Sequence, residues 1–287
     1  MKILPLDIGL FPEKQGISCV ENLLLYILRA NNFPYTYLYY KSYRPFIDVL
    51  HYSINNKLDY ANNDMIERLQ KTATDEGYID LRYLDDISDI RYKDSYICVM
   101  VSPIFSKDIY QVSLARADHF ILLGRYEQGK YTYINDIPQD INTISENTLN
   151  TYLNNKGIAI NVCSVPGEST KKQYLTKMVN ELTMTLGTIE TGVPNVTDLL
   201  LLRDALLIHK IIMRRAFEFL NAYIKCNDIL NILTNIETFC NKVEYMRLRK
   251  IYDEKRIYNM IIDICSNEKK IVETLFNRIQ EEGLYVR

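Results

Sequence analysis

The pattern of apolar residues changes near residue 165, and this change constrains the fold more than any other feature of the sequence. Before it, short apolar runs of strand length occur, such as residues 95–101, which end before Pro103. After residues 165–169, strong helix formers dominate and apolar residues recur at helical spacing. The sequence predicts an α+β region over residues 1–165 and a helical region over residues 166–287. The break is short, so we expect the two regions to pack together.

Individual elements follow from the same patterns. Helices are expected over residues 19–30, 64–74, 170–187, 197–225, 228–241, 243–265 and 268–283. Strands are expected over residues 95–101, 119–126, 130–135 and 157–163. Residues 35–53 are rich in tyrosine and match neither pattern.

Cys19 stands at the expected start of the first helix. Ser18 and Glu21 have the spacing of a capping box, which makes Ser18 the N-cap and Cys19 the first helical residue. The N–H groups at a helix N-terminus favour negative charge, and a thiolate is negative. Cys19 is therefore a candidate nucleophile, although a lone cysteine at a helix start is more often a small buried residue.

A histidine and an acidic residue occupy the two ends of a predicted hairpin. If Glu127 and Gln128 form its turn, His119 lies directly opposite Asp136, with Cβ atoms roughly 5 Å apart. If the turn is one residue later, Asp136 becomes a diagonal neighbour. Asn135 is expected on the other face of the sheet, unless a β-bulge exchanges the two side chains.

These residues predict a catalytic triad, in the order Cys, His, Asp. Cys19 would be the nucleophile, activated by the helix N-terminus and by His119 as the base, and Asp136 would orient His119. The backbone N–H of Cys19 and the side chain of Gln15 would stabilise the oxyanion. Each residue alone has a simpler structural interpretation, but their combination favours a catalytic site.

Composition argues against several other functions. The chain has 287 residues and a net charge of −2, so no global basic field points to nucleic acid. Its longest apolar stretch, residues 199–213, is short and contains charged side chains, which argues against a membrane span. Six scattered cysteines and three histidines show neither a disulfide framework nor zinc-ligand spacing. We expect a cytoplasmic protein with reduced cysteines that uses no metal or cofactor.

Two motifs of the N-terminal region resemble those of papain-fold peptidases of the C39 type. One is Cys19 followed by an apolar helix. The other is His119-Phe, three apolar residues and Gly, followed by a strand that ends in Asn135-Asp136-Ile-Pro. The sequence is more similar to the butirosin biosynthesis protein H family, in which a papain-like domain precedes a variable helical region. Over about residues 5–165, this implies a papain-like cysteine protease fold with an N-terminal helix packed on an antiparallel sheet.

The resemblance also implies a reaction. An acyl group would pass from the phosphopantetheine thioester of an acyl or peptidyl carrier protein to Cys19, and then to a small-molecule amine. The product would be an amide, made in natural-product or antibiotic biosynthesis. Papain-like enzymes carry an oxyanion glutamine six residues before the cysteine, whereas Gln15 lies four residues before Cys19. A C39-like peptidase or amidase and a non-catalytic binding protein are the alternatives.

The helical region contains a locally basic segment at residues 245–256. Such a segment could dock an acidic carrier protein, although a solvated helix face with i, i+4 ion pairs is the simpler interpretation. The long apolar helix expected from residue 197 could bury its surface within the chain or in a homodimer.

Overall fold

The computed structural model describes residues 6–11, 18–57, 64–87, 95–112, 119–186, 193–224 and 228–281. The chain divides into two compact units. A sheet unit comprises Met1–Tyr35 and Arg68–Pro166, and a helical unit comprises Thr36–Glu67 and Gly167–Arg287. The division at Pro166 lies next to the boundary expected from the sequence. The segment Thr36–Glu67, however, clusters with the C-terminal helices and not with the N-terminal region to which the sequence assigned it.

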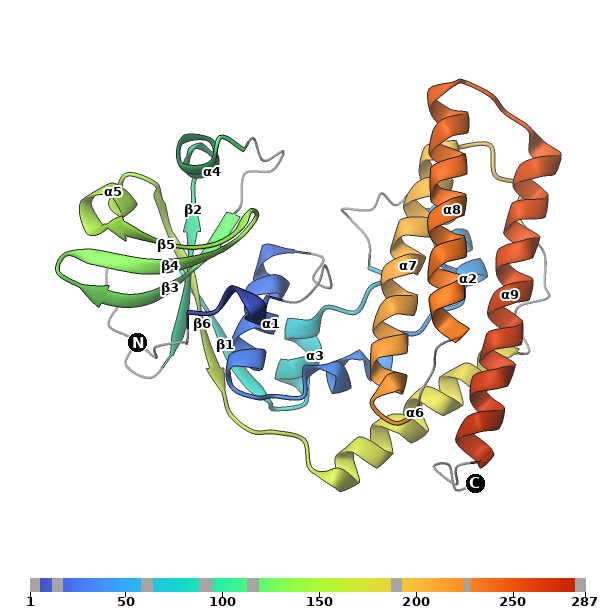
Figure 1. The fold of residues 1–287 in the computed structure, drawn as a ribbon, viewed down its shortest axis with the longest axis horizontal. Helices are drawn as coiled ribbons and strands as arrows, with labels where there is room; N and C mark the ends of the chain where they lie inside the picture. Colours follow the sequence, from blue (N-terminus) through green and yellow to red (C-terminus); the bar gives the residue numbers. More distant parts are fainter. Residues whose placement is uncertain are drawn as a thin grey trace. The chain divides into compact units, whose positions relative to one another are not determined.

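The sheet unit has an α+β fold built on six antiparallel strands, paired in the order β1-β6-β2-β3-β4-β5 (Figure 1). The strands are β1 Ile79–Leu84, β2 Tyr96–Val101, β3 His119–Glu127, β4 Lys130–Asp136, β5 Gln139–Ser145 and β6 Leu153–Val162. The four strands expected from the sequence are confirmed. The sequence missed β1 and β5 because these edge strands carry exposed polar side chains and lack a clear alternation of apolar residues.

In the described part of this unit, five short helical elements accompany the sheet: η1 Ile8–Leu10, α1 Cys19–Ala30, α3 Leu69–Asp75, α4 Pro103–Tyr110 and α5 Glu146–Asn150. The bounds expected for α1 are confirmed, and Ser18 caps the helix by accepting a hydrogen bond from the Glu21 N–H (3.3 Å). Every side chain from Leu23 to Leu28 is fully buried. A run of six consecutive apolar residues leaves no polar face over this part of the helix, which is stable only inside a core.

Helix α1 packs on one face of the sheet, and helices α4 and α5 pack on the other face. Successive strand residues point to opposite faces of a sheet. The Tyr96 hydroxyl donates to Asn31 at the end of α1, which places the even-numbered residues of β2 toward α1. The odd-numbered residues form a second core with α4 and α5: Ile97, Val99, Val101, Phe105, Ile121, Leu123, Tyr131, Tyr133 and Leu149. The site described below lies at one end of these two layers.

Glu21 connects α1 to α3. Its side chain is fully buried, and its carboxylate accepts a hydrogen bond from the N–H of Leu69, the first residue of α3 (2.9 Å). The N-cap of α3, Arg68, makes no side-chain capping bond. The Glu21 carboxylate therefore satisfies one of the free N–H groups at this helix start. The sequence suggested that this helix begins at residue 64, but the contact with Glu21 explains why α3 begins at Leu69.

The turn of the β3–β4 hairpin is one residue later than the first alternative considered from the sequence. Glu127 pairs with Lys130, so Gln128 and Gly129 form the two-residue turn. Both have a left-handed backbone, with φ of 50° and 77°. This conformation is the one that a tight hairpin turn requires, and it suits a glycine in the second position.

A β-bulge then changes the register between Leu123 and Tyr126. Beyond it, Leu123 pairs with Tyr133. When the register shifts by one residue, a residue of β3 shares its sheet face with the next set of alternate residues of β4. Continued to the start of β3, the shifted register puts His119 on the same face as Asn135. The bulge has therefore put Asn135, and not Asp136, on the sheet face of His119.

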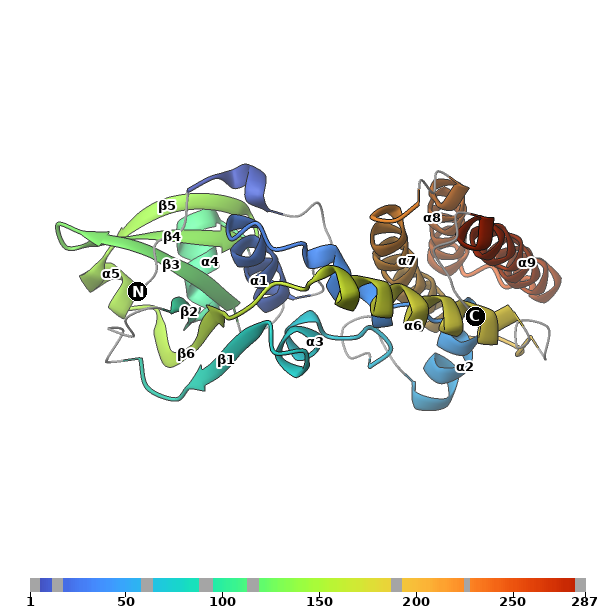
Figure 2. The same ribbon diagram turned by 90° about the horizontal axis from the view of Figure 1, so that it is seen from below.

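The helical unit is built from α2 Phe46–Asn56, α6 Glu168–Leu186, α7 Leu199–Asn221, α8 Asp228–Leu248 and α9 Glu254–Glu281, preceded by η2 Tyr35–Lys41. Helix α8 lies between α7 and α9, α2 packs against α7, and α6 packs against α9 (Figures 1 and 2). No helix in the described part of the chain is long and apolar enough to cross a membrane.

The prediction of three helices after residue 228 is wrong, because two long helices occupy this region. The break lies at residues 249–253, where Lys250 has a left-handed backbone (φ 54°) and Asp253 accepts from the Arg256 N–H to cap α9. Asn241 and Ser266, near which the sequence suggested breaks, are inside α8 and α9. Weak helix formers continue a helix when its apolar face is packed.

A buried polar cluster joins α2, α7 and α9. The Glu268 carboxylate accepts hydrogen bonds from the Tyr43 hydroxyl (3.1 Å) and the Phe46 N–H (3.0 Å), and it lies 3.4 Å from His209 Nε2. Burial raises the pKa of Glu268 to about 8 and lowers the pKa of His209 to about 3. At neutral pH both side chains are therefore uncharged, which is the state that an apolar interior favours.

We expect this cluster to make the free energy of unfolding depend on pH. Between pH 6.5 and 8 the unfolded chain has lost the Glu268 proton, whereas the folded chain retains it. Stability should therefore fall by about 1.4 kcal/mol per pH unit over this range as the pH rises. Below pH 6.5 the unfolded state also binds a proton at His209, which offsets the Glu268 contribution down to about pH 4.5.

Glu268→Gln retains an oxygen acceptor and should remove the fall between pH 6.5 and 8, as measured by chemical denaturation at several pH values. Glu273→Gln, which changes an exposed carboxylate of the same helix, should leave it in place. The explanation is wrong if the two variants have the same pH dependence.

Candidate active site

The Cys19 thiol lies where the N-terminus of α1 meets the start of β3, and it is partly exposed. Three backbone N–H groups lie near enough to its sulfur to lower the pKa of the thiol: those of Cys19 and Val20 from the helix, and that of Phe120 from the strand. Phe120 directly follows His119, so the first residues of the helix and of the strand meet. The structure therefore places Cys19 next to the chain segment that carries the predicted base.

Burial raises the pKa of Cys19 to about 11, from an ordinary value of 9.0. The Asp136 carboxylate also raises it, because a thiolate would bring a second negative charge close to the first. The three N–H groups lower the pKa but do not compensate for burial. The N–H groups at the helix N-terminus lower the pKa of the thiol, as expected, but burial outweighs them in the resting site. The thiol is protonated at neutral pH and requires a base.

His119 is almost fully buried and is held by Asn135. Its Nε2 lies 2.6 Å from Asn135 Oδ1, and Asn135 Nδ2 donates to the Pro138 carbonyl (2.8 Å). The Asn135 oxygen can only accept, so His119 Nε2 must carry the hydrogen. In the neutral imidazole, Nδ1 is then the unprotonated nitrogen. This tautomer leaves Nδ1 free to accept a proton.

Asp136 lies on the Nδ1 side of His119. Its carboxylate is buried, and Oδ1 is 3.9 Å from Nδ1, which is too long for a hydrogen bond but close enough for charge attraction. The other oxygen accepts a hydrogen bond from Asn22 Nδ2 of α1 (2.9 Å). Burial raises the pKa of Asp136, whereas the Asn22 hydrogen bond and the His119 charge lower it.

Asp136 lies close to both other residues of the predicted triad: its carboxylate is 3.9 Å from His119 Nδ1 and its charge acts on the Cys19 thiol. The structure differs from the prediction in which residue orients His119, because Asn135 makes the hydrogen bond that the sequence assigned to Asp136. The bulge in the hairpin is the cause, since it moves Asn135 to the face of His119. Gln15, the proposed oxyanion donor, lies outside the described residues.

Sequence reasoning missed Asn22 entirely. Asn22 is three residues after Cys19, so the helical period puts both on neighbouring positions of one helix face. A polar residue in a run of buried apolar ones was the available signal. The site thus contains two amide side chains, each of which binds one of the groups expected to take part in proton transfer.

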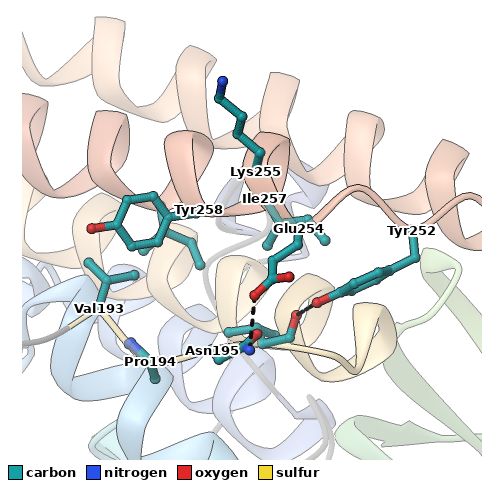
Figure 3. A pocket seen from close by; sticks show the side chains of 10 residues that line it. Val193, Pro194, Asn195, Tyr252, Glu254, Lys255, Ile257 and Tyr258 are labelled. Carbon is teal, nitrogen blue, oxygen red and sulfur yellow. Dashed lines mark hydrogen bonds between the residues drawn. The ribbon is translucent and has the colours of Figure 1, made fainter.

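A hollow in the helical unit is lined by side chains of a different kind from those around Cys19 (Figure 3). It has a volume of about 530 Å³ and lies between residues 193–196 and the start of α9. The Glu254 carboxylate accepts from the Asn195 amide (3.1 Å), and the Tyr252 hydroxyl donates to the Val196 carbonyl (3.2 Å). These polar groups bond to the wall of the hollow, and its lining contains no cysteine or histidine. The combination of nucleophile and base therefore places the candidate active site at Cys19.

Among the described residues, no group of three or more His, Cys, Asp or Glu side chains could hold a metal ion. No protein-family model matches the sequence, and no curated protein matches it either. A thiol, an imidazole whose Nε2 hydrogen is fixed by its acceptor and a hydrogen-bonded orienting amide are the parts required for nucleophilic acyl transfer.

We expect Cys19 to react slowly with iodoacetamide in the resting protein, because only the thiolate is nucleophilic. With a pKa near 11, its thiolate fraction at pH 7 is about 100-fold below that of a thiol with the ordinary value of 9.0. The rate should rise about tenfold per pH unit toward pH 11. Asp136→Asn should increase the rate, since it removes the carboxylate charge.

Peptide mass spectrometry can follow Cys19 and the exposed Cys163 in the same sample, with Cys163 as the internal reference. A rate for Cys19 that already reaches a plateau near neutral pH would contradict the assignment of a protonated resting thiol.

Proposed function

We propose that this protein is a papain-like, cysteine-dependent acyltransferase. It moves an acyl group from a carrier-protein thioester through an acyl-Cys19 intermediate to an amine, forming an amide. The observation that carries the proposal is the buried 2.6 Å contact between His119 and Asn135, next in sequence to Phe120 and Asp136, which both act on the Cys19 thiol. The carrier-protein donor and the amine acceptor come from the resemblance to the butirosin biosynthesis protein H family.

In the first step His119 Nδ1 accepts the thiol proton as the Cys19 sulfur attacks the thioester carbonyl carbon. The C–S bond to the donor then breaks, and the proton on Nδ1 passes to the departing thiolate. General-base catalysis is needed because the resting thiol is protonated. The Cys19 N–H at the helix start would donate to the developing oxyanion.

In the second step the amine nitrogen attacks the carbonyl carbon of the acyl-Cys19. The amine loses a proton, the C–S bond to Cys19 breaks, and the sulfur regains its proton through His119. Exchange of one thioester for another is nearly balanced in free energy, whereas conversion of a thioester to an amide is favourable. The reaction therefore needs neither a metal nor an external energy source.

The other parts of the chain agree with this assignment. The five cysteines in the described part of the chain are free thiols, which suits a reducing compartment such as the cytoplasm. In the turn between α8 and α9, Leu248, Ile251 and Tyr252 are exposed beside several basic side chains. We propose this turn as the docking surface for the acidic carrier.

An activated acyl thioester should label Cys19 through one covalent bond. With N-acetylcysteamine acetyl thioester, intact-mass spectrometry should detect one acetyl group on the wild-type protein and none on Cys19→Ala. Cys163→Ala, which removes an exposed thiol, should still be labelled. Addition of butylamine should then release N-butylacetamide faster than water releases acetate. Faster hydrolysis would favour a peptidase or amidase, and an unlabelled wild-type Cys19 would favour a non-catalytic protein.

The docking surface predicts a difference between carrier-bound and free donors. Lys255→Glu reverses a charge at the start of α9 and should raise the KM for a carrier-bound acyl thioester about tenfold. The KM for the small N-acetylcysteamine thioester should not change, because it does not use this surface. Lys270→Glu makes the same change on an exposed position of the same helix and serves as the control. Equal effects of the two variants would exclude a docking role for the turn.

A further inference from the structure

Asn22 and Asp136 form a connection between the helix of the nucleophile and the strand pair of the base. Asn22 Nδ2 donates to Asp136 Oδ2 over 2.9 Å, and the two residues are 114 positions apart in the chain. Asn22 lies one helical turn after Cys19, so it moves with the nucleophile. Asp136 lies next to Asn135, so it moves with the residue that holds His119. The hydrogen bond therefore fixes the two halves of the site relative to each other.

The two Asp136 oxygens have different environments. Oδ2 is bound by Asn22, whereas Oδ1 accepts no hydrogen bond from the described residues although it is buried. A buried, unpaired carboxylate oxygen is costly. Oδ1 faces His119 Nδ1 at 3.9 Å, and Nδ1 is the nitrogen without a hydrogen in the neutral ring. When Nδ1 takes the Cys19 proton, it becomes a charged donor directed toward this oxygen.

We propose that Asn22 is a positioning residue that holds Asp136 as the counter-ion of the imidazolium formed during proton transfer from Cys19. This inference rests on the proposed function and extends it, because it assigns a role to a residue outside the Cys, His and Asn set. The arrangement stabilises the His119 charge only while the proton resides on Nδ1, so it favours the transition state over the resting state.

The same carboxylate has opposite effects on the two partners of the proton transfer. It repels a thiolate at Cys19 and attracts an imidazolium at His119. Asp136→Asn should therefore accelerate alkylation of Cys19 at high pH, where the thiolate forms by loss of its proton to water. It should slow acylation of Cys19 near neutral pH, where His119 takes the proton. A residue that merely supported the fold would not produce opposite changes.

Asn22 acts through Asp136, and this can be tested with the pH dependence of acylation. Without the Asn22 donor, the Asp136–His119 pair should take up its first proton at a higher pH. We expect Asn22→Leu to move the acidic limb of the acylation rate upward by about one pH unit. Asn22→Asp, which keeps the shape and removes the donor, should move it in the same direction.

The experiment measures the burst of 4-nitrophenolate released when p-nitrophenyl acetate acylates Cys19, between pH 4.5 and 8.5, after subtraction of the Cys19→Ala signal. Asn31→Leu is the matched control. Asn31 is the C-cap of α1 and, like Asn22, bonds to the sheet, here through Tyr96, but it lies at the far end of the helix from Cys19. Its substitution should leave the acidic limb in place.

A double-mutant cycle completes the test. In the Asp136→Asn background, Asn22→Leu should no longer move the acidic limb, because the carboxylate on which Asn22 acts is absent. An equal shift in both backgrounds, or no shift in either Asn22 variant, would overturn the role of Asn22 while Cys19 acylation itself remained. Absence of a Cys19-dependent burst in the wild type would overturn both this inference and the proposed function.

Discussion

The hydrogen bond between His119 Nε2 and Asn135 Oδ1 determines the chemistry available to the rest of the site. Because the Asn135 amide is itself fixed by the Pro138 carbonyl, its oxygen faces the ring and the ring has one neutral tautomer. The free nitrogen therefore points to the side on which Asp136 lies. Had the amide been turned, Nδ1 would carry the hydrogen and could not accept the thiol proton. The roles of Cys19 and Asp136 both depend on this one contact.

Burial and charge oppose each other around the thiol. Burial disfavours a thiolate and also disfavours the Asp136 carboxylate, so a site that holds both groups ionised would be costly. The resting site reduces this cost by keeping the Cys19 proton. It retains a carboxylate whose charge becomes useful only when His119 is protonated. Asn22 supports that state with a donor from the same helix that presents Cys19.

The sequence was sufficient to predict the parts of the fold with strong periodic signals. The bounds of α1 and the strands of the central hairpin follow from apolar spacing and from the Ser18 cap. It could not identify the residue that holds His119, because a single bulge residue decides which face Asn135 occupies. Nor could it place the segment Thr36–Glu67, whose cluster depends on contacts with residues more than 100 positions later, such as Glu268.

The described residues contain two buried histidine–carboxylate pairs, His119–Asp136 and His209–Glu268. Their surroundings differ in the properties that a reactive pair requires. His209 and Glu268 are closer together, at 3.4 Å, than His119 and Asp136. Yet Glu268 also binds Tyr43 and Phe46, and burial keeps it protonated at neutral pH. His209 has no orienting amide comparable to Asn135 among its described contacts. Proximity of a histidine to a carboxylate is therefore not the distinguishing property. What distinguishes His119 is a fixed tautomer whose free nitrogen faces Asp136, the carboxylate that also acts on the Cys19 thiol.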